Sequence, residues 1–237
     1  MKKSFFTFII FSIPYLITAQ FYDDFSDGDF TNNPTWFGDI DKFEVDSLNK
    51  LHTKYDSLSG ESYLVTQCKV SQNAVWQFKV EYQFDPSSSN FSKVFLISDV
   101  SDLTSNLNGY FIKIGGVSGN IDDVSLYSKI GNVELKIIDG VDGVSAFNPN
   151  LKIKVTRDSI GNWELFVDTS NIYILQGVTF NNSVKNSEYF GVFCKYTKTR
   201  SDKFYFDDFS VSGSFLVDTI RPVVIAAQIN SASSVLV

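Results

Sequence analysis

The stretch Phe204-Tyr205-Phe206-Asp207-Asp208-Phe209-Ser210-Val211 decides the fold, because a near copy, Phe21-Tyr22-Asp23-Asp24-Phe25, stands near the other end of the chain. Aromatic residues favour strands, and the two segments carry the same acidic pair. We expect them to be neighbouring strands that bring the two ends of one domain side by side. The chain between them is then the body of a β-sandwich.

The sequence between these two segments reads as a series of short strands. In residues 75–84, aromatic and aliphatic residues alternate with polar ones, which predicts a strand with one buried and one wet face. Turn pairs such as Gly115-Gly116 and Gly131-Asn132 separate other strand-like runs. These patterns predict an all-β sandwich or barrel with very little helix, and they place Trp76 and Trp163 in its core.

Composition limits both the size of the domain and its partners. The 237 residues suffice for one β domain of roughly 200 residues, but not for a second full domain. The net charge is −7 and no block of Lys or Arg is present. Nucleic acids and anionic membranes are therefore not expected as partners.

The two ends of the sequence differ from the domain between them. Residues 1–19 combine Met1-Lys2-Lys3, an apolar run too short to span a bilayer, and the small residue Ala19, which predicts a cleaved signal peptide. We therefore expect a secreted or cell-surface protein without a membrane span after cleavage. The β-sandwich domain is assigned to residues 20–212. Residues 213–237 are interpreted as a linker and the truncated start of a following domain.

Cys68 and Cys194 are the only cysteines. An oxidising compartment permits one disulfide between them. Both also lie in strand-like runs, where a cysteine often behaves as a small buried hydrophobe. The sequence leaves the two interpretations open.

Several spaced motifs resemble a known family over about residues 21–212. They are Asp23-Asp24-Phe25, Trp76, Asn108-Gly109-Tyr110, Ile153 to Asp158 with Gly161-Asn162-Trp163, Tyr189-Phe190-Gly191-Val192, and Phe206-Asp207-Asp208-Phe209. Together they look like the concanavalin A-like (laminin-G-like) jelly-roll domain at the N-terminus of large secreted surface proteins of Bacteroidota. The resemblance implies a two-sheet antiparallel jelly roll, a cell-surface location, and Ig-like modules after residue 212.

The resemblance also raises the prospect of one structural calcium ion where the two ends of the domain meet. Carboxylate and carbonyl oxygens are the ligands that Ca²⁺ prefers. The candidate ligands are Asp23, Asp24, Asp27, Asp207 and Asp208. The alternative is that these carboxylates are solvated or paired with a base such as Arg200.

A glycan or another extracellular polymer is the expected partner, because sugars stack on exposed aromatic faces while polar side chains bind their hydroxyls. The candidate ligand-binding residues are Trp36, Tyr127, Tyr173, Tyr196, Asn108, Asp122 and Arg200. For any single aromatic residue, a place in the core is the more common role.

Catalysis is not expected. Glycoside hydrolysis normally needs two carboxyl groups that flank the scissile bond, and Glu44-Val45-Asp46 lacks the second Glu of the glucanase motif. His52 is the only histidine, so a Ser-His-Asp triad has poor support. We expect a non-catalytic module for carbohydrate binding or adhesion, and the alternative is a purely structural N-terminal cap.

Overall fold

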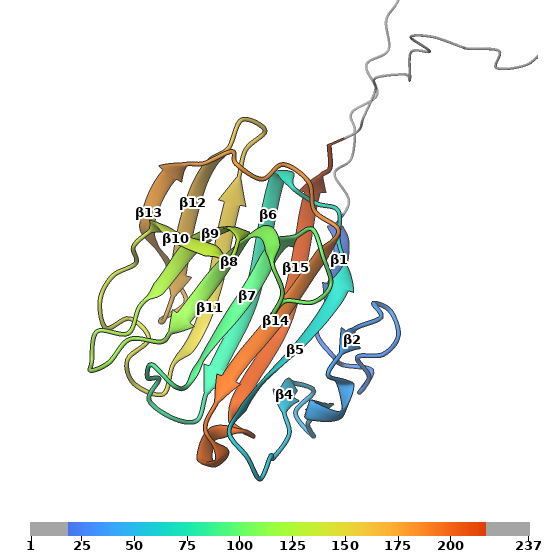
Figure 1. Ribbon diagram of the computed structural model, residues 1–237, viewed down its shortest axis with the longest axis vertical. Coiled ribbons are helices and arrows are strands. Elements are labelled where there is room, and N and C mark those ends of the chain that lie inside the picture. Colours follow the sequence, from blue (N-terminus) through green and yellow to red (C-terminus); the bar gives the residue numbers. More distant parts are fainter. Residues whose placement is uncertain (1–18, 217–237) are drawn as a thin grey trace, which may run out of the picture.

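The computed structural model describes residues 19–216, which form two packed antiparallel sheets (Figure 1). The strands are β1 (Ala19–Asp23), β2 (Phe37–Gly38), β3 (Phe43–Val45), β4 (Leu51–Thr53), β5 (Gly60–Gln67), β6 (Gln72–Tyr82), β7 (Phe91–Ser98), β8 (Leu107–Gly115), β9 (Val124–Gly131), β10 (Val133–Ile138), β11 (Asn150–Arg157), β12 (Asn162–Asp168), β13 (Tyr173–Phe180), β14 (Tyr189–Tyr196) and β15 (Phe204–Ser214). The helices of this part of the chain are two 3₁₀ turns, η1 (Ile40–Lys42) and η2 (Lys198–Arg200). None of residues 19–216 belongs to a helix long and apolar enough to cross a membrane.

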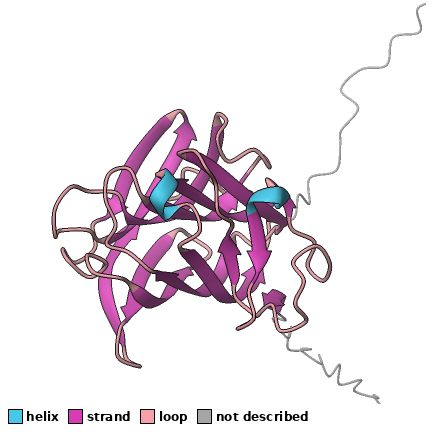
Figure 2. Ribbon diagram, turned by 90° about the horizontal axis from the view of Figure 1, so that it is seen from below, coloured by secondary structure: helices cyan, strands magenta, loops and turns pink. Residues whose placement is uncertain are grey.

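One sheet has eight strands and the other has seven. The eight-stranded sheet runs β13-β12-β11-β6-β15-β4-β3, with β1 also paired to β15, and the seven-stranded sheet runs β10-β9-β8-β7-β14-β5-β2. Figure 2 shows the two layers of strands with the two short helical turns beside them. The all-β, two-sheet prediction is confirmed. The predicted signal peptide and following domain lie almost wholly outside the described residues, although β15 continues to Ser214, two residues past the predicted boundary.

The two ends of the domain meet as the sequence predicted. β1 pairs antiparallel with β15, so that Asp23 lies opposite Phe209, and the rings of Phe25 and Phe209 are 5.9 Å apart. Phe206 and Phe209 are both buried although they stand three residues apart, which a regular strand does not allow. The pairing of β15 with β6 shifts by a bulge between Asp207 and Ser210, where Asp208 has a φ of 54°. This bulge turns the Phe209 side chain into the core, on the same side as Phe206.

The core between the sheets is rich in aromatic residues. Trp76 and Trp163 are fully buried and stacked, with centroids 5.7 Å apart, which confirms their predicted place. The buried guanidinium of Arg157 lies 5.0 Å from the Trp163 ring and donates hydrogen bonds to the carbonyls of Ser71 and Val184. Burial lowers the pKa of Arg157 from its ordinary value, and these acceptors stabilise the charge.

No disulfide joins Cys68 and Cys194, so the buried-thiol interpretation holds. Cys194 lies in β14 opposite Ser62, whereas Cys68 directly follows the Gln67–Tyr189 pair at the other end of the same ladder. Six residues of strand place the two about 20 Å apart, far beyond the roughly 7 Å that a bridge spans. Burial raises the pKa of the Cys68 thiol to about 12 and that of Cys194 well above its ordinary value.

Candidate functional site

The outer face of the seven-stranded sheet is covered by its own side chains. Cross-strand pairing aligns one residue from each of six strands in a row: Phe37, Val65, Gly191, Phe95, Phe111 and Tyr127. Phe95 and Phe111 are fully buried, and the Phe111 ring stacks on Tyr127 at 5.1 Å. Gly191 leaves a gap in this row that Leu103 fills, because a Cβ on Gly191 would come within 3.0 Å of the Leu103 side chain.

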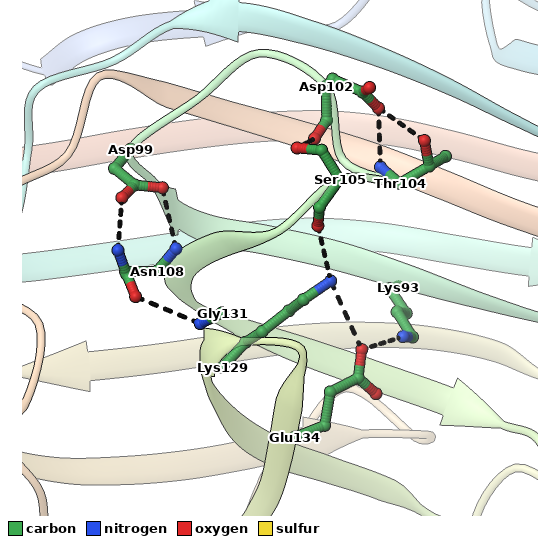
Figure 3. Close-up of polar contacts among 9 residues, drawn as sticks. All are labelled: Lys93, Asp99, Asp102, Thr104, Ser105, Asn108, Lys129, Gly131 and Glu134. Atoms are coloured by element: carbon green, nitrogen blue, oxygen red, sulfur yellow. Dashed lines mark hydrogen bonds and ion pairs between the residues drawn. The ribbon is translucent and has the colours of Figure 1, made fainter.

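Leu103 belongs to the loop between β7 and β8, which polar bonds fasten over this face (Figure 3). The Asp99 carboxylate accepts two hydrogen bonds from Asn108, from the backbone N–H at 2.8 Å and from the side-chain amide at 2.7 Å. The Lys129 amine donates to the Ser105 carbonyl at 3.2 Å. The loop therefore holds an apolar lid in place over the aromatic row.

Lysines close the rest of this face. The Lys93 amine lies 4.6 Å from the Phe111 centroid and 2.6 Å from a Glu134 oxygen, and Lys129 lies 3.9 Å from the same oxygen (Figure 3). Burial lowers the pKa of Lys129 and of Lys113. Because its aromatic rings are covered and its charges are mostly paired, this face offers little open platform to a ligand.

The outer face of the eight-stranded sheet is open and polar. A groove of about 350 Å³ lies across it, lined by Tyr22, Gln77, Phe78, Lys79, Lys152, Tyr173, Asp208 and Ser210. An adjoining hollow of about 330 Å³ shares Lys79 and Lys152 and adds Asn150, Asp168, Thr169, Ser170 and Asn171. The groove thus combines aromatic rings with amide, hydroxyl, ammonium and carboxylate groups.

Strand register positions these side chains. Asp207, Lys79, Lys152, Asp168 and Tyr173 are successive cross-strand partners from β15 to β13. One step along the strands, Tyr22 lies opposite Ser210, which lies opposite Gln77. The alternation in β6 that buries Trp76 and Phe78 turns Gln77 and Lys79 to the outer face.

Two tyrosines of the groove expose their rings: Tyr22 is 55% and Tyr173 is 37% exposed. The Tyr22 hydroxyl donates to the Asp24 carboxylate at 3.3 Å, which restrains the ring beside the groove. Burial and then the neighbouring Asp208 raise the pKa of Asp207 from its ordinary value. An aromatic surface beside hydrogen-bonding groups suits the apolar ring faces and hydroxyls of a sugar.

The predicted ligand-binding residues do not form one site. Trp36 and Tyr196 are 1% and 3% exposed, so their assignment as open platforms is wrong, because both rings pack into the core. Tyr127 lies on the covered face, whereas Asn108 is exposed at the start of β8, where its side chain bonds to Asp99. Asp122 is fully buried, and burial raises its pKa. The half-buried Arg200 stacks on Phe84 at 5.5 Å. Tyr173 alone among these residues lines the groove.

Four of the five predicted metal ligands accept hydrogen bonds from groups of the chain. Asp23 accepts from the Phe25 N–H at 3.0 Å and from the Trp36 indole N–H at 2.7 Å. Three of the other predicted ligands accept backbone N–H groups nearby: Asp24 from Ser26, Asp27 from Asp29, and Asp207 from Asp208. Within residues 19–216, no three His, Cys, Asp or Glu side chains gather as a metal would require. The five carboxylates are therefore not gathered into one cluster in the described part of the chain.

Asp23 is instead part of the seam between the domain ends. Burial raises its pKa to about 6, although the hydrogen bonds from Trp36 and Phe25 oppose that shift. The carboxylate satisfies two buried donors that would otherwise lack partners. Its contacts thus define a structural role for the acidic residue that the sequence assigned to a metal.

The catalytic groups considered from the sequence are also structural. Glu44 pairs with the His52 ring at 3.2 Å across the β3–β4 hairpin. Asp46 accepts the backbone N–H groups of Leu48 and Lys50 in the turn. Both acidic residues therefore have partners within the hairpin.

Sequence reasoning missed most of the groove, namely Tyr22, Gln77, Lys79, Lys152 and Ser210. The polar residues of β6 were predicted to face solvent. The alternation in β6 does not predict, however, which other strands lie next to it in the sheet. Asp208 was expected near the domain ends as a metal ligand, and the structure places it with Tyr173 in one groove.

No protein-family model and no curated protein matches the sequence. Solved structures do match the fold. The legume lectin-like domain from Entamoeba histolytica aligns with a TM-score of 0.63 at 11% identity, over 86% of this chain and 100% of that one.

Two further structures are similar. The exoplasmic/lumenal domain of VIP36, in its Ca²⁺/Man-bound form, aligns with a TM-score of 0.57 at 12% identity, over 78% of this chain and 84% of that one. A protein with a galectin-like fold from Bacillus subtilis aligns with a TM-score of 0.54 at 11% identity, over 82% and 95%. With the two-sheet topology, these likenesses establish the fold of this chain as a lectin-like, concanavalin A-like jelly roll.

Proposed function

We propose that this chain is a non-catalytic, extracellular carbohydrate-binding module, and that it binds glycans in the groove on the outer face of the eight-stranded sheet. The observation that carries the proposal is the pair of exposed tyrosine rings, Tyr22 and Tyr173, beside polar side chains around one hollow of about 350 Å³. Pockets for small ligands commonly combine such apolar surfaces with a few placed polar groups.

The structural neighbours support a glycan partner through what their titles describe. VIP36 is described with mannose and with Ca²⁺ bound, and another neighbour is one of the endo-acting O-glycanases expressed by gut bacteria. Fold alone does not fix function, because one fold carries many sites. The proposal therefore depends on the groove of this chain.

Export is part of the same proposal. The segment 1–19 has the features of a signal peptide, and the sequence after residue 212 suits the start of a following module. A secreted module attached to further domains would hold a larger protein on a polysaccharide surface.

Affinity electrophoresis in gels that contain a panel of polysaccharides tests the proposal. We expect at least one polysaccharide to retard the protein, and Tyr173→Ala or Tyr22→Ala to weaken this binding about tenfold, since one aromatic contact contributes about 1 kcal/mol or more. Tyr127→Ala, on the covered face, is the matched control and should leave binding unchanged.

Two results would contradict the proposal. If no polysaccharide retards the protein, the chain is better explained as a structural cap. If reducing sugar is released from any polysaccharide of the panel, the module is an enzyme.

A further inference from the structure

Two lysines line the groove, and a third lies beside them on the same face of the sheet. Lys79 and Lys152 are directly opposite each other on β6 and β11, and Lys154 follows on the same face of β11. Within residues 19–216, none of the three forms an ion pair, although Asp and Glu outnumber Lys and Arg by 27 to 20 in the chain. Like charges directly opposite each other destabilise a sheet. The two amines therefore repel each other, although Asp207 lies opposite Lys79 and Asp168 lies opposite Lys152 on their other sides.

The contacts of the three amines are weak. The Lys152 amine donates one hydrogen bond of 3.4 Å to the Asn171 side-chain oxygen. The Lys154 amine lies 5.3 Å from the Phe166 centroid. Within residues 19–216, most of the N–H donors of these three amines make no hydrogen bond to the protein.

The carboxylates around the lysines are engaged in turns. Asp168 accepts the N–H groups of Ser170 and Ile172 at 2.8 and 2.9 Å and is only 6% exposed. Asp207 accepts the N–H of Asp208 at 2.8 Å. Asp208 is exposed on the bulge of β15, at the Tyr22 side of the groove. These groups reduce the local positive potential, but none of them bridges Lys79 and Lys152.

We infer that the groove selects acidic polysaccharides, with a carboxylate or sulfate of the ligand bound between Lys79 and Lys152 and a neighbouring sugar ring against Tyr173. This inference rests on the proposed function and specifies its ligand class. An anionic group at this position accepts hydrogen bonds from both amines and removes the repulsion between them. Tyr173, two strands from Lys152 in the same cross-strand row, is placed to contact the adjoining sugar.

Matched polymers test the inference, since each pair shares a backbone and differs in charge. Calorimetry compares polygalacturonate with fully methyl-esterified pectin, and dextran sulfate with dextran, in calcium-free buffer. We expect at least one acidic polymer to bind about tenfold or more tighter than its neutral partner. The polygalacturonate arm detects a carboxylate ligand and the dextran sulfate arm detects a sulfate ligand.

Substitutions locate the effect. Lys79→Gln and Lys152→Gln should each weaken binding of the acidic polymer about tenfold and leave binding of a neutral polymer within about twofold. Lys185→Gln, at an exposed lysine outside the groove, is the control and should change neither. Thermal unfolding without ligand should show Lys79→Gln to be as stable as the unsubstituted chain or more so, because a repulsion is removed.

The possible results distinguish selectivity for acidic polysaccharides from glycan binding in general. Neutral glycans bound through Tyr173, with no preference for the charged partners, would overturn the inference and leave the proposed function standing. A loss of acidic binding that is equal in Lys79→Gln and Lys185→Gln would show a general charge effect and also overturn it. The absence of binding to every polymer would overturn both.

Discussion

The two sheets use their outer faces in opposite ways. On the seven-stranded sheet, an aromatic row is covered by Leu103 and by Lys93, whose amine lies over the Phe111 ring. On the eight-stranded sheet, most of the side chains that line the groove are polar, and the rings of Tyr22 and Tyr173 remain exposed. An aromatic residue that lies outside the sandwich core is thus not always a binding residue, because a loop can make a second core above it.

The difference follows from the loops. The residues between β7 and β8 form a lid that Asp99 and Lys129 fasten to the sheet. Over the groove of the other sheet, no described segment contributes an apolar lid comparable to Leu103. A ligand can therefore enter a preformed groove on the eight-stranded sheet, whereas on the seven-stranded sheet it would have to displace packed side chains.

The largest expected effect is on the covered face. Phe111→Ala should lower the free energy of unfolding by about 3–5 kcal/mol, because it empties a fully buried aromatic site. Phe166→Ala, at a half-buried ring on the open face, should cost about 1 kcal/mol or less. Urea denaturation measures both, and similar losses would show that the two faces are packed alike.

The seam between the domain ends should make stability depend on pH. Because the folded pKa of Asp23 is raised to about 6, folding favours its protonated form. This contribution is complete below pH 4 and is lost as the pH rises through 6, a change of up to about 3 kcal/mol.

Denaturation of the protein and of Asp23→Asn between pH 4 and 7 checks this prediction. The variant removes the titrating group and should lack this component of the pH dependence, although it also loses one acceptor for the Trp36 or Phe25 N–H. Parallel pH profiles for the two proteins would show that Asp23 does not titrate in this range.

The lid offers a smaller and more local test. Asp99→Ala removes both acceptors for Asn108 and should destabilise the protein by about 1 kcal/mol, since the bonds are exposed and water replaces them in part. Asp99→Asn keeps one acceptor and should cost less. Hydrogen exchange at Leu103 and its neighbours should rise in the Ala variant, and unchanged exchange would mean that the lid does not depend on Asp99.

The smallest effect is expected at the groove. Tyr173→Ala should change the free energy of unfolding by no more than about 0.5 kcal/mol, because the ring is exposed at an edge strand. Combined with a loss of glycan binding, this result would separate a binding role from a packing role. A loss of several kcal/mol would instead assign Tyr173 to the core.

The sequence by itself determined the fold and its closure. The alternation around Trp76 and Phe78 decides which face of β6 is buried, since successive side chains of a strand point to opposite faces. The paired Phe-Asp-Asp-Phe and Asp-Asp-Phe motifs predicted the contact between Phe25 and Phe209. These are local periodicities and matching strand ends, which a single sequence displays directly.

Only the tertiary structure decided which aromatic and acidic residues are available to a ligand. Trp36 and Tyr173 look equally exposed in sequence, yet one is 1% and the other 37% exposed, because burial depends on which distant strands and loops cover a ring. Asp23 and Lys79 likewise received their roles from partners far along the chain, Trp36 and Lys152. Cross-strand register and loop coverage join residues that sequence spacing does not relate, so the groove became visible only in the folded chain.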